Sequence, residues 1–137
     1  MAKPTILQVL PALNTGGAER TALDIGHAVS KAGWTSLITS GGGRLKDEAE
    51  QLGSRHLELP LDTKNPITMI RNIGRIRSLI KTHNVDLVHA RSRAVAWSAF
   101  FAAKQVGIPF VTTYHGAYSG LSGPKRAYNS VMAKGDL

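Results

Sequence analysis

The sequence predicts an α/β fold, a Rossmann-like doubly wound parallel sheet in a single domain. Short apolar segments typical of buried strands alternate along the chain with segments of helical periodicity. The joints between them carry glycine or proline, the residues that end helices and form turns. Parallel strands joined by right-handed helical crossovers require helices to cover the sheet. The length of 137 residues fits one domain with a buried core.

The first strand, turn and helix form the segment around which we expect the site. The apolar run Ile6–Leu10 predicts a buried strand, the loop after it contains Gly16 and Gly17, and a helix is expected to begin near Ala18. The start of a helix presents free N–H groups and the positive end of the helix dipole, a combination that binds phosphate. The glycine spacing matches neither a dinucleotide fingerprint nor a P-loop, so a simple tight turn remains the alternative.

Glycine, proline and capping residues set the bounds of the other elements. Gly33, Gly53 and Gly107 end helices, and Asn65 before Pro66 is a helix-start signature. The further strands are expected at Trp34–Ser40, Arg55–Leu59 near a sheet edge, Asp86–Ala90 and Phe110–Tyr114. The further helices are expected at Leu45–Leu52, Pro66–His83, Ser92–Val106 and Lys125–Lys134. In the first helix we expect a buried stripe of Ala18, Ala22, Ile25 and Val29.

The predicted helix Pro66–His83 has one apolar and one basic side. Its apolar side is expected to pack on the sheet and comprises Met69, Ile70, Ile73, Ile76, Leu79 and Ile80. Its basic side carries Arg71, Arg75 and Lys81. Because the apolar side is needed to cover the sheet, the basic side is left either for peripheral attraction to an anionic membrane or for plain solvation.

Composition excludes several classes of function. The chain has no cysteine, which rules out disulfides, cysteine-ligated zinc and thiol catalysis. The first residues, MAKPT, do not resemble a secretory signal, and no window has the roughly 18 apolar residues that a membrane span requires. We therefore expect a cytoplasmic protein.

The net charge of +8 indicates an anionic partner. Phosphate esters, nucleic acid and an acidic membrane surface all match this charge, and a basic surface that only solvent contacts is the alternative. We expect no nucleic-acid partner, because the aromatic residues fall in segments predicted to be buried and no recognised binding module is present.

Ligands of open α/β sheets bind outside the carboxyl ends of the strands. This rule gathers the polar residues that follow each predicted strand on one rim. These residues are Asn14, Gly16, Gly17, Glu19, Gly41–Gly43, His89, Arg91, Ser92, Arg93, His115, Gly116 and Tyr118. The remaining histidines, His27, His56 and His83, are predicted to lie elsewhere.

Two groups on this rim carry suitable chemistry. Arg91 and Arg93 place two guanidiniums at the start of a predicted helix, where they suit phosphate or carboxylate; an internal salt bridge for one and solvent for the other is the alternative. His115 precedes a glycine-rich loop and could donate to a sugar hydroxyl or a phosphoryl oxygen. For His89 the alternative is a buried neutral histidine. No metal-ligand spacing occurs, so we expect no metal cofactor.

Four stretches in this order resemble the N-terminal domain of family 4 glycosyltransferases with the GT-B architecture: LPALNTGGAER, VHARSRAVAW, PFVTTYHGAYSG and KRAYNSVMAKGD. They cover most of the chain, and the similarity is greatest to the bacterial cell-envelope branch, such as lipopolysaccharide core enzymes. The resemblance implies a retaining enzyme without a bound metal. Such an enzyme would transfer a hexose from a nucleotide sugar to a cell-envelope glycan or lipid-linked acceptor, in the cytoplasm or at the inner face of the membrane.

The resemblance also implies roles for the rim residues. Gly16 and Gly17 would contact the donor diphosphate, and His115 would be catalytic, near the donor sugar. The acceptor cleft would contain Asn14, Glu19, Arg91, Ser92, Arg93, Gly116 and Tyr118.

The family also requires a C-terminal donor-binding domain, which residues 1–137 do not contain. We therefore expect one acceptor-side domain with no turnover by itself. Two other functions stay open: a stand-alone phospho-ligand or nucleotide-binding module, and a basic membrane-associated interaction domain.

Overall fold

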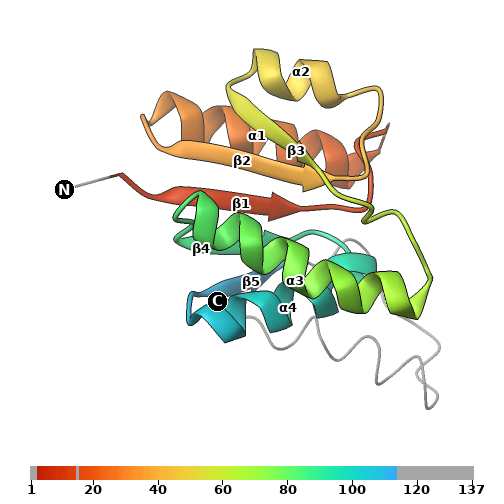
Figure 1. Ribbon diagram of the computed structural model, residues 1–137. Helices are drawn as coiled ribbons and strands as arrows, with labels where there is room; N and C mark the ends of the chain where they lie inside the picture. The colour runs from red at the N-terminus through yellow and green to blue at the C-terminus, as the bar shows by residue number, and fades with distance from the viewer. Residues whose placement is uncertain (1–2, 15, 114–137) are drawn as a thin grey trace.

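The computed structural model describes residues 3–14 and 16–113, which contain a five-stranded parallel sheet (Figure 1). The strands are β1 (Thr5–Val9), β2 (Thr35–Ser40), β3 (Ser54–Glu58), β4 (Leu87–Ala90) and β5 (Phe110–Thr112). Their order across the sheet is β3-β2-β1-β4-β5, with every neighbouring pair parallel. The chain therefore starts in the centre and winds outward in both directions. The predicted doubly wound sheet is confirmed, and so is the edge position of β3.

Helices cover both faces of this sheet. They are α1 (Gly17–Lys31), α2 (Lys46–Gln51), α3 (Pro66–Thr82) and α4 (Arg93–Val106). In Figure 1, α1 and α2 lie in the upper part of the view with β2 and β3, and α3 and α4 lie in the lower part with β4 and β5. The two pairs of helices contribute to separate apolar clusters, one on each face of the sheet. None of the described helices has both the length and the apolar character needed to cross a bilayer. The predicted loop from His115 and the predicted helix Lys125–Lys134 lie outside the described residues.

Local signals begin and end the helices where expected. The Asn65 side chain accepts hydrogen bonds from the backbone N–H groups of Ile67 (2.9 Å) and Thr68 (3.3 Å), which caps α3. Gly33 and Gly107 follow α1 and α4 with φ of +85° and +87°, a conformation that other residues rarely adopt.

The two faces of the sheet differ in polarity. The face toward α3 and α4 carries a large apolar core that includes Leu7, Leu37, Ile76, Val88 and Phe110. The face toward α1 and α2 has a smaller apolar cluster and a buried polar strip. That strip runs across three strands and comprises Gln8 on β1, Ser36 and Ser40 on β2, and Ser54 and His56 on β3.

The expected buried stripe of α1 is wrong in part. Ile25 is 40% exposed, whereas Ala22, Leu23 and Gly26 are buried against the sheet. A Cβ atom on Gly26 would overlap the Ser54 hydroxyl and lie 3.0 Å from Ser36 Oγ. Because the helix approaches the polar strip this closely, it turns its smallest residues inward and leaves Ile25 outside.

The His56 side chain is buried and does not lie on the rim, as predicted from its position within a strand. Its Nε2 lies 2.7 Å from Ser40 Oγ, and this oxygen accepts a hydrogen bond from the Gly42 N–H (3.0 Å). The Ser40 hydroxyl is thus free to donate to Nε2. Burial lowers the pKa of His56, with a smaller contribution from Lys46, so the ring is a neutral acceptor.

The expected apolar side of α3 is wrong at Ile70, whereas Met69 and Ile73 are half-buried and Ile76 and Ile80 are buried. Ile67 and Ile70 are 63% and 67% exposed. The buried residue of the first two turns is Asn72, whose Nδ2 donates to the Pro60 carbonyl (3.0 Å) and whose Oδ1 accepts from Arg75 Nη1 (2.9 Å). An internal polar anchor thus replaces an apolar contact, and Arg75 is partly buried rather than part of a free basic side.

The close packing of α1 predicts the effect of one added methyl group. Gly26→Ala should lower the free energy of unfolding by about 1–3 kcal/mol, because the new Cβ overlaps Ser54. Gly74→Ala in α3 is the matched control, since its Cβ would meet only Arg77 Nη2 at 3.8 Å. It should be neutral or stabilise by up to about 1 kcal/mol. Urea unfolding measures both, and equal effects would contradict this account of the helix contact.

Candidate functional site

The loops after β1 and β2 are joined by backbone hydrogen bonds at the carboxyl rim of the sheet. The Leu13 N–H donates to the Gly42 carbonyl (2.9 Å), and the Gly41 N–H donates to the Pro11 carbonyl (2.8 Å). A Cβ atom on Gly43, where φ is +150°, would overlap the Leu13 carbonyl. Gly41–Gly43 therefore lie on the rim as predicted, where they allow the two loops to pack together.

The start of α1 lies beside these loops and is open. Gly16 is the N-cap residue without a side-chain hydrogen bond, and Gly17 begins the helix. Both are exposed, and a Cβ atom on Gly17 would meet nothing within 4 Å. A Cβ atom on Gly16 would lie 2.8 Å from Glu19 Oε1, so the Glu19 carboxylate folds back over the helix start. This is where an anion is favoured by the N–H groups and the helix dipole.

A buried arginine follows β4. Arg91 is 3% exposed, its backbone N–H donates to the Val9 carbonyl (3.1 Å), and its Nε donates to Gln8 Oε1. Burial lowers the pKa of Arg91 to about 10, so the guanidinium stays charged at neutral pH. Among the described residues no carboxylate forms an ion pair with it. Among the described residues, Arg91 therefore does not form the internal salt bridge that was the alternative interpretation.

A pocket of about 330 Å³ brings these elements together at the point where the strand order reverses, between β1 and β4. Leu10, Pro11, Ala12, Ala18, Glu19, Arg91, Ser92 and Arg93 line it. Two guanidiniums and one carboxylate thus surround a partly apolar hollow. Such a pocket can hold an anion together with the hydroxyl groups of a polar ligand.

The other predicted site residues take different places. Asn14 is exposed beside Gly43 and is not among the pocket-lining residues. Ser92 precedes α4, and its carbonyl accepts from the Ala96 N–H (3.1 Å). His89 is half-buried and bonds to Thr113 Oγ1. The predicted residues His115, Gly116 and Tyr118 lie outside the described residues.

Sequence reasoning did not identify Gln8. Its Nε2 donates to the Ala22 carbonyl of α1 (3.0 Å), and its Oε1 accepts from Arg91, so it joins helix, strand and pocket. The available signal was a single polar residue in the otherwise apolar run ILQVL.

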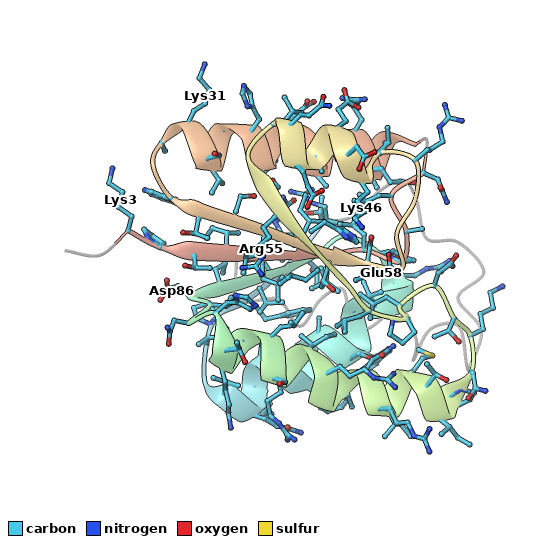
Figure 2. The ribbon with its side chains drawn as sticks, turned by 45° about the horizontal axis from the view of Figure 1, so that its top comes forward. Lys3, Lys31, Lys46, Arg55, Glu58 and Asp86 are labelled. Atoms are coloured by element: carbon cyan, nitrogen blue, oxygen red, sulfur yellow. The ribbon has the colours of Figure 1, made fainter. Side chains whose placement is uncertain are left out.

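Charged residues mark the two ends of the sheet in Figure 2. Lys3 and Asp86 lie at the amino end, where Asp86 Oδ2 accepts from the Thr5 N–H (2.8 Å). Glu58 lies at the opposite, carboxyl end. A Cβ atom on Gly42 would lie 2.8 Å from Glu58 Oε1, so a second carboxylate reaches the rim. The described residues contain no group of three histidine or acidic side chains able to hold a metal ion.

Comparison with known proteins identifies the fold family. The model of Glycosyltransferase Family 4 matches residues 15–135. A glycosyltransferase from Rickettsia africae is 42% identical, with a TM-score of 0.82 over 96% of this chain and 35% of that protein. The comparison with curated protein sequences finds no match.

More distant structures share the fold. MurG of Acinetobacter baumannii is 16% identical, with a TM-score of 0.73 over 96% of this chain and 39% of that one. Anabaena Alr3699/HepE, solved in complex with UDP and glucose, is 20% identical, with a TM-score of 0.70 over 95% and 36%. The chain thus spans about a third of the length of these enzymes.

The family model covers most of the chain, and the parallel sheet with helices on both faces matches the fold of the similar solved structures. This chain belongs to Glycosyltransferase Family 4 and has the Rossmann-like sheet of one half of a GT-B enzyme.

Proposed function

We propose that this chain is the N-terminal, acceptor-side domain of a retaining glycosyltransferase that moves a hexose from a nucleotide sugar to a cell-envelope glycan or a lipid-linked acceptor. The observation that carries the proposal is the pocket between the glycine-bearing start of α1 and the arginines after β4. The coverage of 35% of the Rickettsia africae enzyme supports a second, donor-binding domain in the whole protein.

The start of α1 is suited to the donor diphosphate. The helix N–H groups have no side-chain cap at Gly16, and the missing side chain at Gly17 lets a phosphate approach the backbone. The Glu19 carboxylate occupies this place in the present structure. A bound diphosphate would repel it, and the carboxylate would then be available to accept hydrogen bonds from sugar hydroxyls. The UDP and glucose in the Anabaena structure support a donor of this kind.

Transfer with retention breaks the bond between the anomeric carbon and a donor phosphate oxygen, and the acceptor hydroxyl oxygen bonds to the same face of that carbon. The acceptor O–H bond breaks in this step, and its proton passes to the departing phosphate oxygen. The charge that develops on the leaving diphosphate needs stabilisation, which the helix start and a guanidinium can supply without a metal ion. We propose that the backbone N–H groups of Gly16 and Gly17, at the helix start, contribute to this stabilisation. His115 keeps the catalytic role near the donor sugar that the family resemblance implies.

The same pocket would also suit a stand-alone phospho-ligand or nucleotide-binding module. The two functions differ in the second domain, because only a glycosyltransferase requires it to hold most of the donor. Sugar transfer by the protein encoded by the whole gene therefore separates them.

The 137-residue chain should show no sugar transfer, because it supplies only one wall of the donor site. Its affinity for nucleoside diphosphate sugars should be weak, with Kd on the order of millimolar. Radiolabelled transfer assays and calorimetric titration measure the two quantities. Measurable transfer, or a micromolar Kd, would mean that the donor site is not shared with a second domain.

Gly17→Asp tests the phosphate-binding role of the helix start. The new side chain has free space and its charge suits a helix N-terminus, so thermal stability should be kept or raised. The same charge should repel a diphosphate and weaken UDP binding by about tenfold or more. Gly74→Asp, within α3, is the matched control and should leave UDP binding unchanged. Unaltered UDP binding by a folded Gly17→Asp protein would remove the diphosphate from this position.

A second observation favours peripheral membrane contact, through the first turns of α3. Ile67 and Ile70 are exposed, and Arg71 lies one helical turn from Ile67 on the same side. Ile70 also borders an apolar groove of about 240 Å³ formed with Met69, Ile73, Trp97 and Phe101. Exposed apolar side chains beside cations suit the interface of an anionic bilayer. We propose that this surface contacts the inner face of the membrane, where a lipid-linked acceptor resides.

Replacing both exposed isoleucines, Ile67→Gln with Ile70→Gln, should weaken binding to phosphatidylglycerol vesicles by about tenfold. Ile25→Gln is the matched control, because Ile25 is an exposed isoleucine of α1 on the other face of the sheet. Vesicle sedimentation at low and high salt measures the effect, and salt should weaken the wild-type interaction. Equal losses in the double variant and in the control, or none in either, would exclude this surface.

A further inference from the structure

A buried guanidinium, that of Arg91, lines the rim pocket, and no acidic side chain of the described residues pairs with it. The Arg91 side chain is almost fully buried. Its one hydrogen bond with the described residues joins Nε to Gln8, a neutral side chain. Glu19 lines the same pocket but forms no ion pair with Arg91. Burying a charge without an opposite charge is costly, so this arrangement is one that a bound anion would stabilise.

Gln8 determines which atoms of Arg91 are available to a ligand. Its amide nitrogen donates to the Ala22 carbonyl of α1 (3.0 Å), and its amide oxygen accepts from Arg91 Nε. A backbone carbonyl only accepts and a guanidinium only donates, so turning the Gln8 amide over would lose both bonds. Arg91 is therefore held by Nε, and its two Nη groups are left for the pocket. A glutamate at position 8 would neutralise the guanidinium, whereas glutamine orients it and leaves its charge intact.

We propose that the rim pocket holds a substrate oxyanion against the Nη groups of Arg91, and that Gln8 is the positioning residue for this guanidinium. A guanidinium held at Nε presents parallel N–H groups, the geometry that matches a phosphate or carboxylate. The proposal rests on the glycosyl transfer proposed above. The oxyanion belongs either to the donor diphosphate or to an acidic group of the acceptor.

Nuclear magnetic resonance of the full 137-residue chain tests the contact directly. The ¹⁵N-labelled protein is titrated with inorganic pyrophosphate and, separately, with glucose 6-phosphate, while the Arg91 Nε–H signal and the Gly16 and Gly17 amide signals are followed. Movement of Arg91 together with the glycines under pyrophosphate identifies the donor diphosphate. Movement of Arg91 alone under the sugar phosphate identifies an acceptor group. If neither ligand moves the Arg91 signal, the proposed role of Arg91 is overturned. If pyrophosphate still moves the Gly16 and Gly17 signals in that case, the proposed donor diphosphate site at the start of α1 is unaffected.

Variants then test the role of Gln8. Gln8→Leu should weaken binding of the active ligand by about tenfold although Arg91 is unchanged, and Arg91→Lys should do the same. Gln105→Leu is the matched control, since it removes the acceptor of another arginine, Arg77 (Nη1 to Oε1, 2.6 Å), on the surface. This control should keep the wild-type affinity.

A loss of packing is distinguished from a loss of positioning by two further measurements. The Arg91 Nε–H proton should exchange faster with water in Gln8→Leu, which a purely structural role would not require. Gln8→Glu keeps the shape of the side chain and serves if the leucine variant does not fold; it should also weaken binding about tenfold, because its carboxylate pairs with Arg91. Wild-type affinity in either folded Gln8 variant would overturn the positioning role.

Discussion

The close contact of α1 with the polar strip of β1, β2 and β3 determines where the rim residues lie. Besides the small apolar cluster on this face, α1 contacts the strip through the close approach of Gly26 to Ser36 and Ser54 and through the Gln8 bond to the Ala22 carbonyl. These contacts set the height of the helix above the sheet. They thereby place its first turn, with Ala18 and Glu19, at the pocket that Arg91 and Arg93 also line.

The same strip explains how a charge can lie inside this domain. Within the strip, the Ser36 and Ser54 hydroxyls pair with each other (2.7 Å) and Ser40 pairs with His56 Nε2 (2.7 Å), whereas His56 Nδ1 is buried with no partner among the described residues. Gln8 extends it toward β4, where Arg91 begins the rim. A guanidinium at the edge of a polar layer loses less hydration than one in an apolar core. The low pKa of Arg91 still reflects burial, and its charge is therefore more effective toward a ligand than that of an exposed arginine.

The parts of the fold that depend on local sequence were predictable. Apolar periodicity located the strands and helices, Asn65 marked the start of α3, and Gly33 marked the end of α1, as capping chemistry requires. The errors came from contacts between distant residues. Hydrophobicity favoured Ile25 for the interior, but the tight approach of α1 selected Gly26. Gln8 and Arg91 are 83 residues apart, so no local pattern relates them.

For the site, the rim rule placed Glu19, Arg91 and Arg93 around one pocket because the carboxyl ends of parallel strands share an edge. Gly16 and Gly17 lie at the adjoining start of α1 and are not among the lining residues. The rule could not tell an open glycine from a structural one. Gly17 faces free space, whereas Gly43 is needed for contact with the Leu13 carbonyl. That distinction depends on a neighbouring loop and so required the tertiary structure.

The topology also relates the pocket to the exposed turns of α3. Every helix that follows a strand of a parallel sheet begins at the carboxyl rim, so the first turns of α1, α3 and α4 lie at the same end of the domain. Ile67 and Ile70 occupy the first turns of α3, and the pocket lies between the starts of α1 and α4. A bilayer contacted by α3 would therefore lie near the end of the sheet where the pocket opens. A head group attached to lipid could reach the pocket without leaving the membrane surface, which makes the two proposed surfaces compatible with one acceptor.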